Sequence, residues 1–128
     1  MRLKLLLDSH ILVWWPAGSR RLGARAREII TDSGSELFMS AASWWELGIK
    51  QTLGRLRIDL GATRLAIEAR GVSSIPVTMQ HAEHAATLEK LHGDPFDHML
   101  VAQATYENFR LLTRDKKLEQ YGSRILCV

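Results

Sequence analysis

The sequence predicts an α/β fold, specifically a three-layer α/β/α sandwich with a central parallel sheet. Two observations lead to this prediction. Segments with the character of strands alternate with segments of helical periodicity along all 128 residues. The strand segments are also continuous apolar runs, which is typical of a parallel sheet covered on both faces. The length suits a single domain, residues 1–128.

The expected strands are short and apolar, and they cover residues 3–7, 36–39, 73–77, 111–113 and 124–128. The apolar residues 11–15 end at a predicted turn, Pro16-Ala17-Gly18. A helical pattern follows Ser19, with its apolar face formed by Leu22, Ala26, Ile29 and Ile30. Further helices are expected over residues 41–53, 62–70, 79–91, 96–108 and 115–120, with Ser40 and Thr78 as N-caps.

The composition excludes several classes of protein. Hydrophobic residues make up 46% of the chain and charged residues 24%, the balance of an ordinary globular domain. No apolar stretch is long enough to cross a bilayer, so no membrane partner is expected. The one cysteine, Cys127, cannot form an internal disulfide and is expected to be a buried strand residue, which fits a reducing cytoplasm. The net charge of +3 permits a nucleic-acid partner without requiring one.

Four acidic residues fall near the carboxyl ends of the expected strands, where open parallel sheets form their sites. Asp8 directly follows the first strand, and Asp115 lies two residues past the strand 111–113. Glu46 lies in the helix after the second strand, and Asp97 lies near the start of the helix 96–108. If all four converge, they form an acidic cluster at one edge of the sheet.

Glu46 and Asp97 lie on helix faces that are otherwise apolar. Their neighbours on those faces are Ala42, Ile49 and Leu53 for Glu46, and Leu100, Val101 and Ala104 for Asp97. A carboxylate placed on a core-facing stripe costs free energy unless something compensates its charge. A divalent cation is one such compensation, and carboxylate oxygens suit Mg²⁺ or Mn²⁺. A converging cluster would then suit metal-assisted hydrolysis of a phosphodiester, which needs no covalent nucleophile.

Taken singly, most of these acids have a structural interpretation as well. Asp94-Pro95 reads as an N-cap with proline at the first helical position, and Asp97 then lies in the first turn, where the helix dipole favours an acid. Asp115 can also cap a helix, and Glu46 can pair with Lys50 one turn later. Asp8 is the hardest to explain in this way, because it interrupts an apolar run.

Four stretches resemble the motifs of the PIN-domain family, and in particular the VapC-type toxins. They are residues 5–10 (LLLDSH), 40–47 (SAASWWEL), 91–104 (LHGDPFDHMLVAQA) and 111–115 (LLTRD), and their order and spacing cover nearly the whole chain. The resemblance implies a parallel sheet flanked by helices. It also implies a metal-dependent endoribonuclease, the toxin of a bacterial type II toxin–antitoxin pair, which cleaves transfer or ribosomal RNA and so inhibits translation.

By this resemblance Asp8, Glu46 and Asp97 are the core ligands of Mg²⁺ or Mn²⁺, and Asp115 is a fourth acid that acts directly or through water. The residues expected to support these ligands are Ser9, Asp94 and Thr113, with Asp94 in a capping or supporting role. Ser9 follows the first acid, where the family often has threonine. The resemblance further implies a homodimer and a cognate antitoxin that blocks the site.

Three cationic residues beside the fourth acid, Arg114, Lys116 and Lys117, are candidates for contact with RNA phosphates. The sequence contains two pairs of adjacent tryptophans, Trp14-Trp15 and Trp44-Trp45. Adjacent residues of a helix cannot both face one core, so at least one indole of each pair is expected at an edge or in a protein contact.

The alternative function is a catalytically silent PIN domain that acts as an RNA- or protein-binding regulatory module. The presence of all four acids argues against it. A dehalogenase-type phosphatase needs two aspartates separated by one residue after the first strand, and Asp8-Ser9-His10 does not provide them. A DNA-cleaving nuclease of related fold usually carries more acids and larger insertions than this chain.

Overall fold

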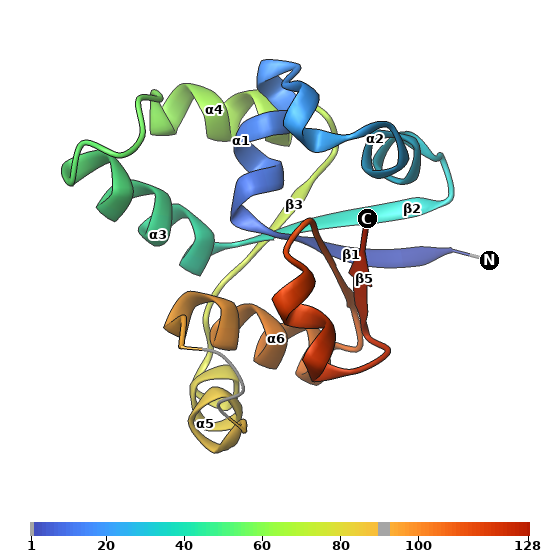
Figure 1. Ribbon diagram of the computed structural model, residues 1–128, viewed down its shortest axis with the longest axis vertical. Helices are drawn as coiled ribbons and strands as arrows, with labels where there is room; N and C mark the ends of the chain where they lie inside the picture. The colour runs from blue at the N-terminus through green and yellow to red at the C-terminus, as the bar shows by residue number, and fades with distance from the viewer. Residues whose placement is uncertain (1, 90–92) are drawn as a thin grey trace.

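The structure is a computed structural model that describes residues 2–89 and 93–128. Within these residues it contains a five-stranded sheet whose pairings are all parallel, in the order β3-β2-β1-β4-β5 (Figure 1). The strands are β1 (Leu3–Leu7), β2 (Ser35–Ser40), β3 (Ser73–Ile75), β4 (Arg110–Thr113) and β5 (Ile125–Cys127). The α-helices are α1 (Ser9–Ala17), α2 (Ala24–Thr31), α3 (Ala41–Thr52), α4 (Leu60–Glu68), α5 (Met79–Thr87) and α6 (Pro95–Glu107), and two 3₁₀ helices are η1 (Arg20–Leu22) and η2 (Lys116–Tyr121).

The central strand β1 is buried on both of its faces, which produces the three layers. Its residues alternate between two cores, as the pleat of a strand requires. Leu5 and Leu7 face a core built with residues of α1, α2 and α4. Leu6 faces a second core, built with residues of α6 and η2. In Figure 1 the first group of helices lies above the sheet and the second below it, so the predicted α/β/α sandwich is confirmed.

Several expected boundaries shift, and each shift has a local cause. The apolar residues 11–15 form the body of α1, which continues through Pro16 to Ala17 before Gly18 ends it in the left-handed region at φ 64°. Proline is tolerated there because its missing N–H removes only one bond near the end of a short helix. The expected turn is therefore confined to Gly18.

The helical pattern after Ser19 divides into η1 and α2 at Gly23. This glycine has φ 83°, and a Cβ atom there would lie 2.7 Å from Arg114 Nη1. A side chain at this position would meet backbone strain, and the flexible end of the Arg114 side chain would have to move aside. The break thus follows from a backbone conformation that glycine adopts more readily than other residues.

Other elements begin or end at a capping residue or before a proline. Asp59 caps α4 by accepting from Ala62 N at 2.9 Å, so this helix starts at Leu60, two residues earlier than expected. Strand β3 ends at Ile75 because the next residue, Pro76, cannot donate a ladder hydrogen bond. Helix α5 ends at Thr87 rather than at 91, and residues 90–92 lie outside the described part of the chain.

Helix α5 is joined to α6 by a buried polar network around His81. The Nδ1 atom of His81 accepts from Thr78 N at 3.0 Å, so the ring proton is on Nε2, which donates to Glu107 Oε1 at 3.0 Å. Gln103 of α6 donates from Nε2 to Pro76 O at 3.2 Å. The network holds α6, which carries Asp97, against the loop that leaves β3.

Cys127 lies in β5 as expected but is only half-buried, because β5 is an edge strand. Burial raises the pKa of its thiol, and the charge of Glu119 adds to the effect. Among the described residues, none of the helices combines the length and the apolar character needed to span a membrane.

The two-sided burial of β1 predicts a large effect of truncating Leu6. Leu6 is 0% exposed and Leu65, on α4, is 61% exposed. We expect Leu6→Ala to lower the free energy of unfolding by about 2–5 kcal/mol through lost burial and a cavity. Leu65→Ala is the matched control and should change it by no more than about 0.5 kcal/mol. Urea denaturation of the two variants measures both values, and equal effects would contradict the assignment of Leu6 to a core.

Candidate active site

The carboxyl ends of three neighbouring strands meet at one edge of the sheet and bring the candidate residues with them. Asp8 follows β1, Ser40 ends β2 and leads into α3, and Thr113 ends β4. Because β1 pairs in parallel with both neighbours, all three ends point the same way. Asp8, Glu46 and Asp97 are all buried, although carboxylates are usually exposed.

Asp8 occupies the N-cap position of α1 but makes no side-chain capping bond. Its Oδ2 atom instead accepts a hydrogen bond from Thr113 Oγ1 at 2.6 Å. Thr113 is fully buried, and its Oγ1 atom also accepts from Asp115 N at 3.0 Å. The Thr113 hydroxyl therefore orients Asp8 and connects it to the turn that begins at Asp115.

Glu46 is held at both carboxylate oxygens. Ser9, the first residue of α1, donates from Oγ to Glu46 Oε1 at 2.7 Å. The Nζ atom of Lys50 lies 2.9 Å from Glu46 Oε2, one helical turn later. Both the expected support by Ser9 and the alternative pairing with Lys50 are thus present at the same carboxylate.

Asp8 and Glu46 are close enough to affect each other's charge. Burial raises the pKa of Asp8 above its ordinary value, and the negative charge of Glu46 raises it further. The Thr113 hydrogen bond, the positive charge of His10 and the Ser9 N–H oppose this shift but do not cancel it. The ionised form of the Asp8 carboxyl is therefore less favourable here than in water, mainly because the carboxyl is buried.

Asp97 lies in the first turn of α6, which packs against α3. The rings of Phe96 and Trp45 meet edge to face, with centroids 5.4 Å apart. Asp94 caps α6, since its Oδ1 atom accepts from Phe96 N at 2.9 Å and from Asp97 N at 3.4 Å. The capping role expected for Asp94 is therefore confirmed.

The fourth acid and the cationic residues beside it lie at the margin of this edge. Asp115 is half-buried, and its Oδ1 atom caps η2 by accepting from Lys117 N at 3.0 Å. Arg114 donates from Nη1 to Val128 O at 2.8 Å, and Lys116 and Lys117 are exposed on η2. Among the described residues, hydrogen bonds through Thr113 connect Asp115 to Asp8.

Comparison with known proteins agrees with this geometry. A sequence model of the PIN domain matches residues 5–123. The chain belongs to the PIN-domain family. Its sequence is 32% identical over 119 residues to Ribonuclease VapC22 of Mycobacterium tuberculosis, and the match covers 91% of each chain. The resemblance inferred from the four sequence stretches is confirmed.

Several solved structures share the fold of this PIN domain, and two of them illustrate the similarity. One is a toxin–antitoxin complex from Klebsiella pneumoniae, with a TM-score of 0.67, 20% identity and 95% of each chain covered. The other is VapBC2 from Rickettsia felis bound to a DNA fragment from the promoter, with a TM-score of 0.68, 12% identity and 98% of each chain covered. At these identities the likeness concerns the fold.

The acidic edge of this PIN domain has chemistry that suits a hard divalent cation, because it offers the oxygens of buried carboxylates. The full ligand set is not gathered, however. Across residues 2–89 and 93–128, no three Asp, Glu, His or Cys side chains lie close enough together to hold a metal ion. Carboxylates repel one another without a cation between them, and here protein donors hold Asp8 and Glu46 separately. The convergence of all four acids stays a prediction.

Two further residues at this edge were not among the expected site residues. Lys50 was expected only as an ion-pair partner that would explain the position of Glu46 without a metal. Ser43, one turn before Glu46, is fully buried, and its Oγ atom has no hydrogen-bond partner among the described residues. The sequence signal was a serine three residues before an acid on an apolar helix face.

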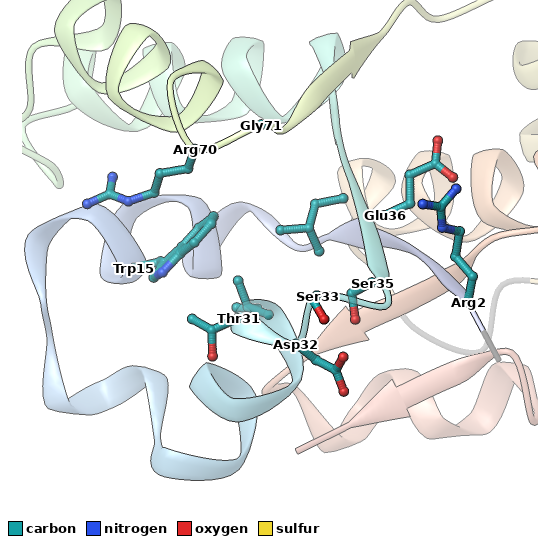
Figure 2. Close-up of a pocket in the computed structure, with 11 residues that line it drawn as sticks. Arg2, Trp15, Thr31, Asp32, Ser33, Ser35, Glu36, Arg70 and Gly71 are labelled. Carbon is teal, nitrogen blue, oxygen red and sulfur yellow. The ribbon is translucent and has the colours of Figure 1, made fainter.

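A cavity of about 650 Å³ lies at the opposite edge of the sheet, where β1 and β2 begin, and it contains none of the candidate site residues. Figure 2 shows Trp15 and Arg70 on one side of it and Arg2 and Glu36 on the other. The Arg70 guanidinium lies over the Trp15 ring, 5.3 Å from its centroid. Of the four indoles, Trp45 is the one most exposed, as expected for one member of its pair, while both Trp14 and Trp15 are half-buried.

The raised pKa of Asp8 predicts how stability depends on pH. The folded protein binds the Asp8 proton more tightly than the unfolded chain does, so this group stabilises the fold below its ordinary pKa of 3.8. That contribution is lost as the pH rises through the higher pKa of the folded state. The Asp8→Asn side chain cannot lose a proton and can still accept a hydrogen bond from Thr113. Without metal, the variant should therefore become increasingly more stable than the native protein as the pH rises.

Thermal unfolding in chelator between about pH 4 and pH 7 measures the difference in Tm between the two proteins. Asp32→Asn, at an exposed turn, is the control and should show a constant difference. A constant difference for Asp8→Asn as well would contradict the assigned burial of the Asp8 charge.

Proposed function

We propose that this PIN domain is a metal-dependent endoribonuclease and the toxin of a bacterial type II, VapBC-like toxin–antitoxin pair, which cleaves RNA and so inhibits translation. The observation that carries the proposal is the burial of two carboxylates, Asp8 and Glu46, at the carboxyl edge of the sheet. The similarity to a ribonuclease over 91% of the chain supports RNA as the substrate. We treat residues 1–128 as one domain, because β5 completes the same sheet.

In this proposal Asp8, Glu46 and Asp97 hold Mg²⁺ or Mn²⁺, and Asp115 contributes directly or through water. A bound divalent ion supplies Lewis-acid activation of the scissile phosphate and of the attacking water. Thr113 keeps the Asp8 carboxylate in one orientation, and Ser9 does the same for Glu46. Support of this kind fixes ligand geometry, and its loss typically costs about 10- to 100-fold in metal affinity or activity.

The RNA backbone would lie against the exposed cations at the margin of the site. Lys116 and Lys117 project from η2 beside Asp115, where they can neutralise phosphates. Arg114 donates to Val128 O through one nitrogen, and its guanidinium has further N–H groups for a phosphate. Transfer or ribosomal RNA is the expected substrate, and we expect the protein to act in the cytoplasm.

The deciding experiment is cleavage of total cellular RNA by the purified protein with Mg²⁺, with Mn²⁺ and with chelator. We expect discrete fragments that depend on the metal. Asp8→Asn and Asp97→Asn should each lower the cleavage rate by about 100-fold or more, because each removes a ligand rather than a supporting group. Asp32→Asn, on an exposed turn, should leave the rate unchanged.

Circular dichroism shows whether each variant is folded. Cleavage that persists in folded Asp97→Asn would defeat the catalytic assignment. RNA binding without cleavage by the folded native protein would favour the alternative, a catalytically silent regulatory module.

The expected partners are a second copy of the chain and a cognate antitoxin, and the solved toxin–antitoxin complexes of the same fold support the latter. Light scattering of the protein alone should give twice the 14.5 kDa mass of one chain. Adding the protein encoded beside it should raise that mass and suppress RNA cleavage. A monomer at micromolar concentration would contradict the dimer, and an unchanged mass after addition would contradict the partner.

A further inference from the structure

We propose that the Lys50 ammonium is a resident counter-cation of the acidic edge, which a divalent ion must displace from Glu46 when the site is loaded. The proposal rests on the metal site of the proposed function. Without this role, Lys50 would be only the i,i+4 salt-bridge partner of Glu46. The supporting observations are the burial of Glu46, the distribution of donors on its two oxygens and the position of Lys50 along α3.

The Lys50–Glu46 pair differs from an ordinary surface pair on a helix. Its N–O distance is 2.9 Å, and the side chains are 30% and 6% exposed. Arg64 and Glu68 on α4 have the same i,i+4 spacing, but their side chains are 47% and 39% exposed. Water screens the second pair, whereas Glu46 has little contact with water and depends on its protein partners for compensation.

The two oxygens of Glu46 have different kinds of partner. Oε1 accepts from the buried hydroxyl of Ser9, a neutral donor on a neighbouring helix. Oε2 is bound to the ammonium of Lys50, a cation on a flexible stem. A divalent ion can replace the second partner without disturbing the first, so Ser9 would keep Glu46 oriented while one cation is exchanged for another.

The position of Lys50 allows this exchange without movement of the backbone. Lys50 lies one turn after Glu46 on α3, and α3 leads away from the carboxyl edge of the sheet. Its four-carbon stem can carry the ammonium from Oε2 into solvent by rotation about side-chain bonds alone. While it stays at Oε2, its charge offsets the repulsion between Asp8 and Glu46 and repels an incoming divalent ion.

If the Lys50 ammonium competes with a divalent ion for Glu46, removing its charge should raise the affinity of the site for the ion. Lys50→Met keeps the unbranched stem but removes the charge, so Mn²⁺ should bind about three- to tenfold more tightly than to the native protein. Lys50→Gln, a second neutral variant, should shift the affinity in the same direction. Lys50→Arg keeps the charge and should bind Mn²⁺ no more tightly than the native protein.

The experiment is calorimetric titration of the full chain with Mn²⁺ at low salt, with Arg64→Met as the matched control for loss of an i,i+4 pair. Thermal unfolding in chelator accompanies it, because loss of the ammonium should lower the Tm of the metal-free neutral variants and Mn²⁺ should restore it. Unchanged or weaker Mn²⁺ binding by both neutral variants would overturn the role of Lys50 and leave the metal site standing. Absence of Mn²⁺ binding by the folded native protein would overturn the metal site itself, and with it this inference.

Discussion

The parallel pairing of β1 with β2 on one side and with β4 on the other places Asp8, Thr113 and the start of α3, which carries Glu46, at one edge of the sheet. Because the three strands run in the same direction, the residues that follow them emerge at a single edge. The hydrogen bond from Asp8 N to Leu112 O brings the end of β1 level with the end of β4, and Thr113 then reaches the Asp8 carboxylate. If either pairing were antiparallel, one of these groups would lie at the opposite edge.

This edge also shows a conflict between folding and function. Asp8 stands at the N-cap position of α1, where an aspartate usually stabilises a helix by about 1 kcal/mol, yet its side chain caps nothing. Its carboxylate is buried near that of Glu46, and hydroxyl and ammonium groups only partly offset the charge. Local rules of structure are commonly broken at functional sites, and the rest of the fold supplies the stability that they lack.

Interactions between close neighbours in the chain were readable from the sequence. Ser40, Thr78 and Asp94 each cap a helix by accepting from an N–H two or three residues later, so a short pattern contains both partners. The apolar strands were equally visible, because burial on both faces removes polar residues from them. Asp8 was recognisable as a candidate because no such local interpretation accounts for it.

Interactions between distant residues could not be read in the same way. The orientation of Asp8 depends on Thr113 of another strand, and the orientation of Glu46 depends on Ser9 of another helix. No local pattern reports the direction in which a guanidinium or a hydroxyl points once the chain has folded. Arg114 is one example, because its position beside an acid suggested a phosphate contact but gave no sign of its hydrogen bond to Val128 O.

The buried charge at Asp8 has a consequence for how altered copies of this chain would behave. Substitutions that neutralise this acid remove a metal ligand of the proposed enzyme and also relieve repulsion inside the fold. Loss of a ligand and a gain in stability would then arise from the same substitution, so an inactive copy of this chain need not be a misfolded one.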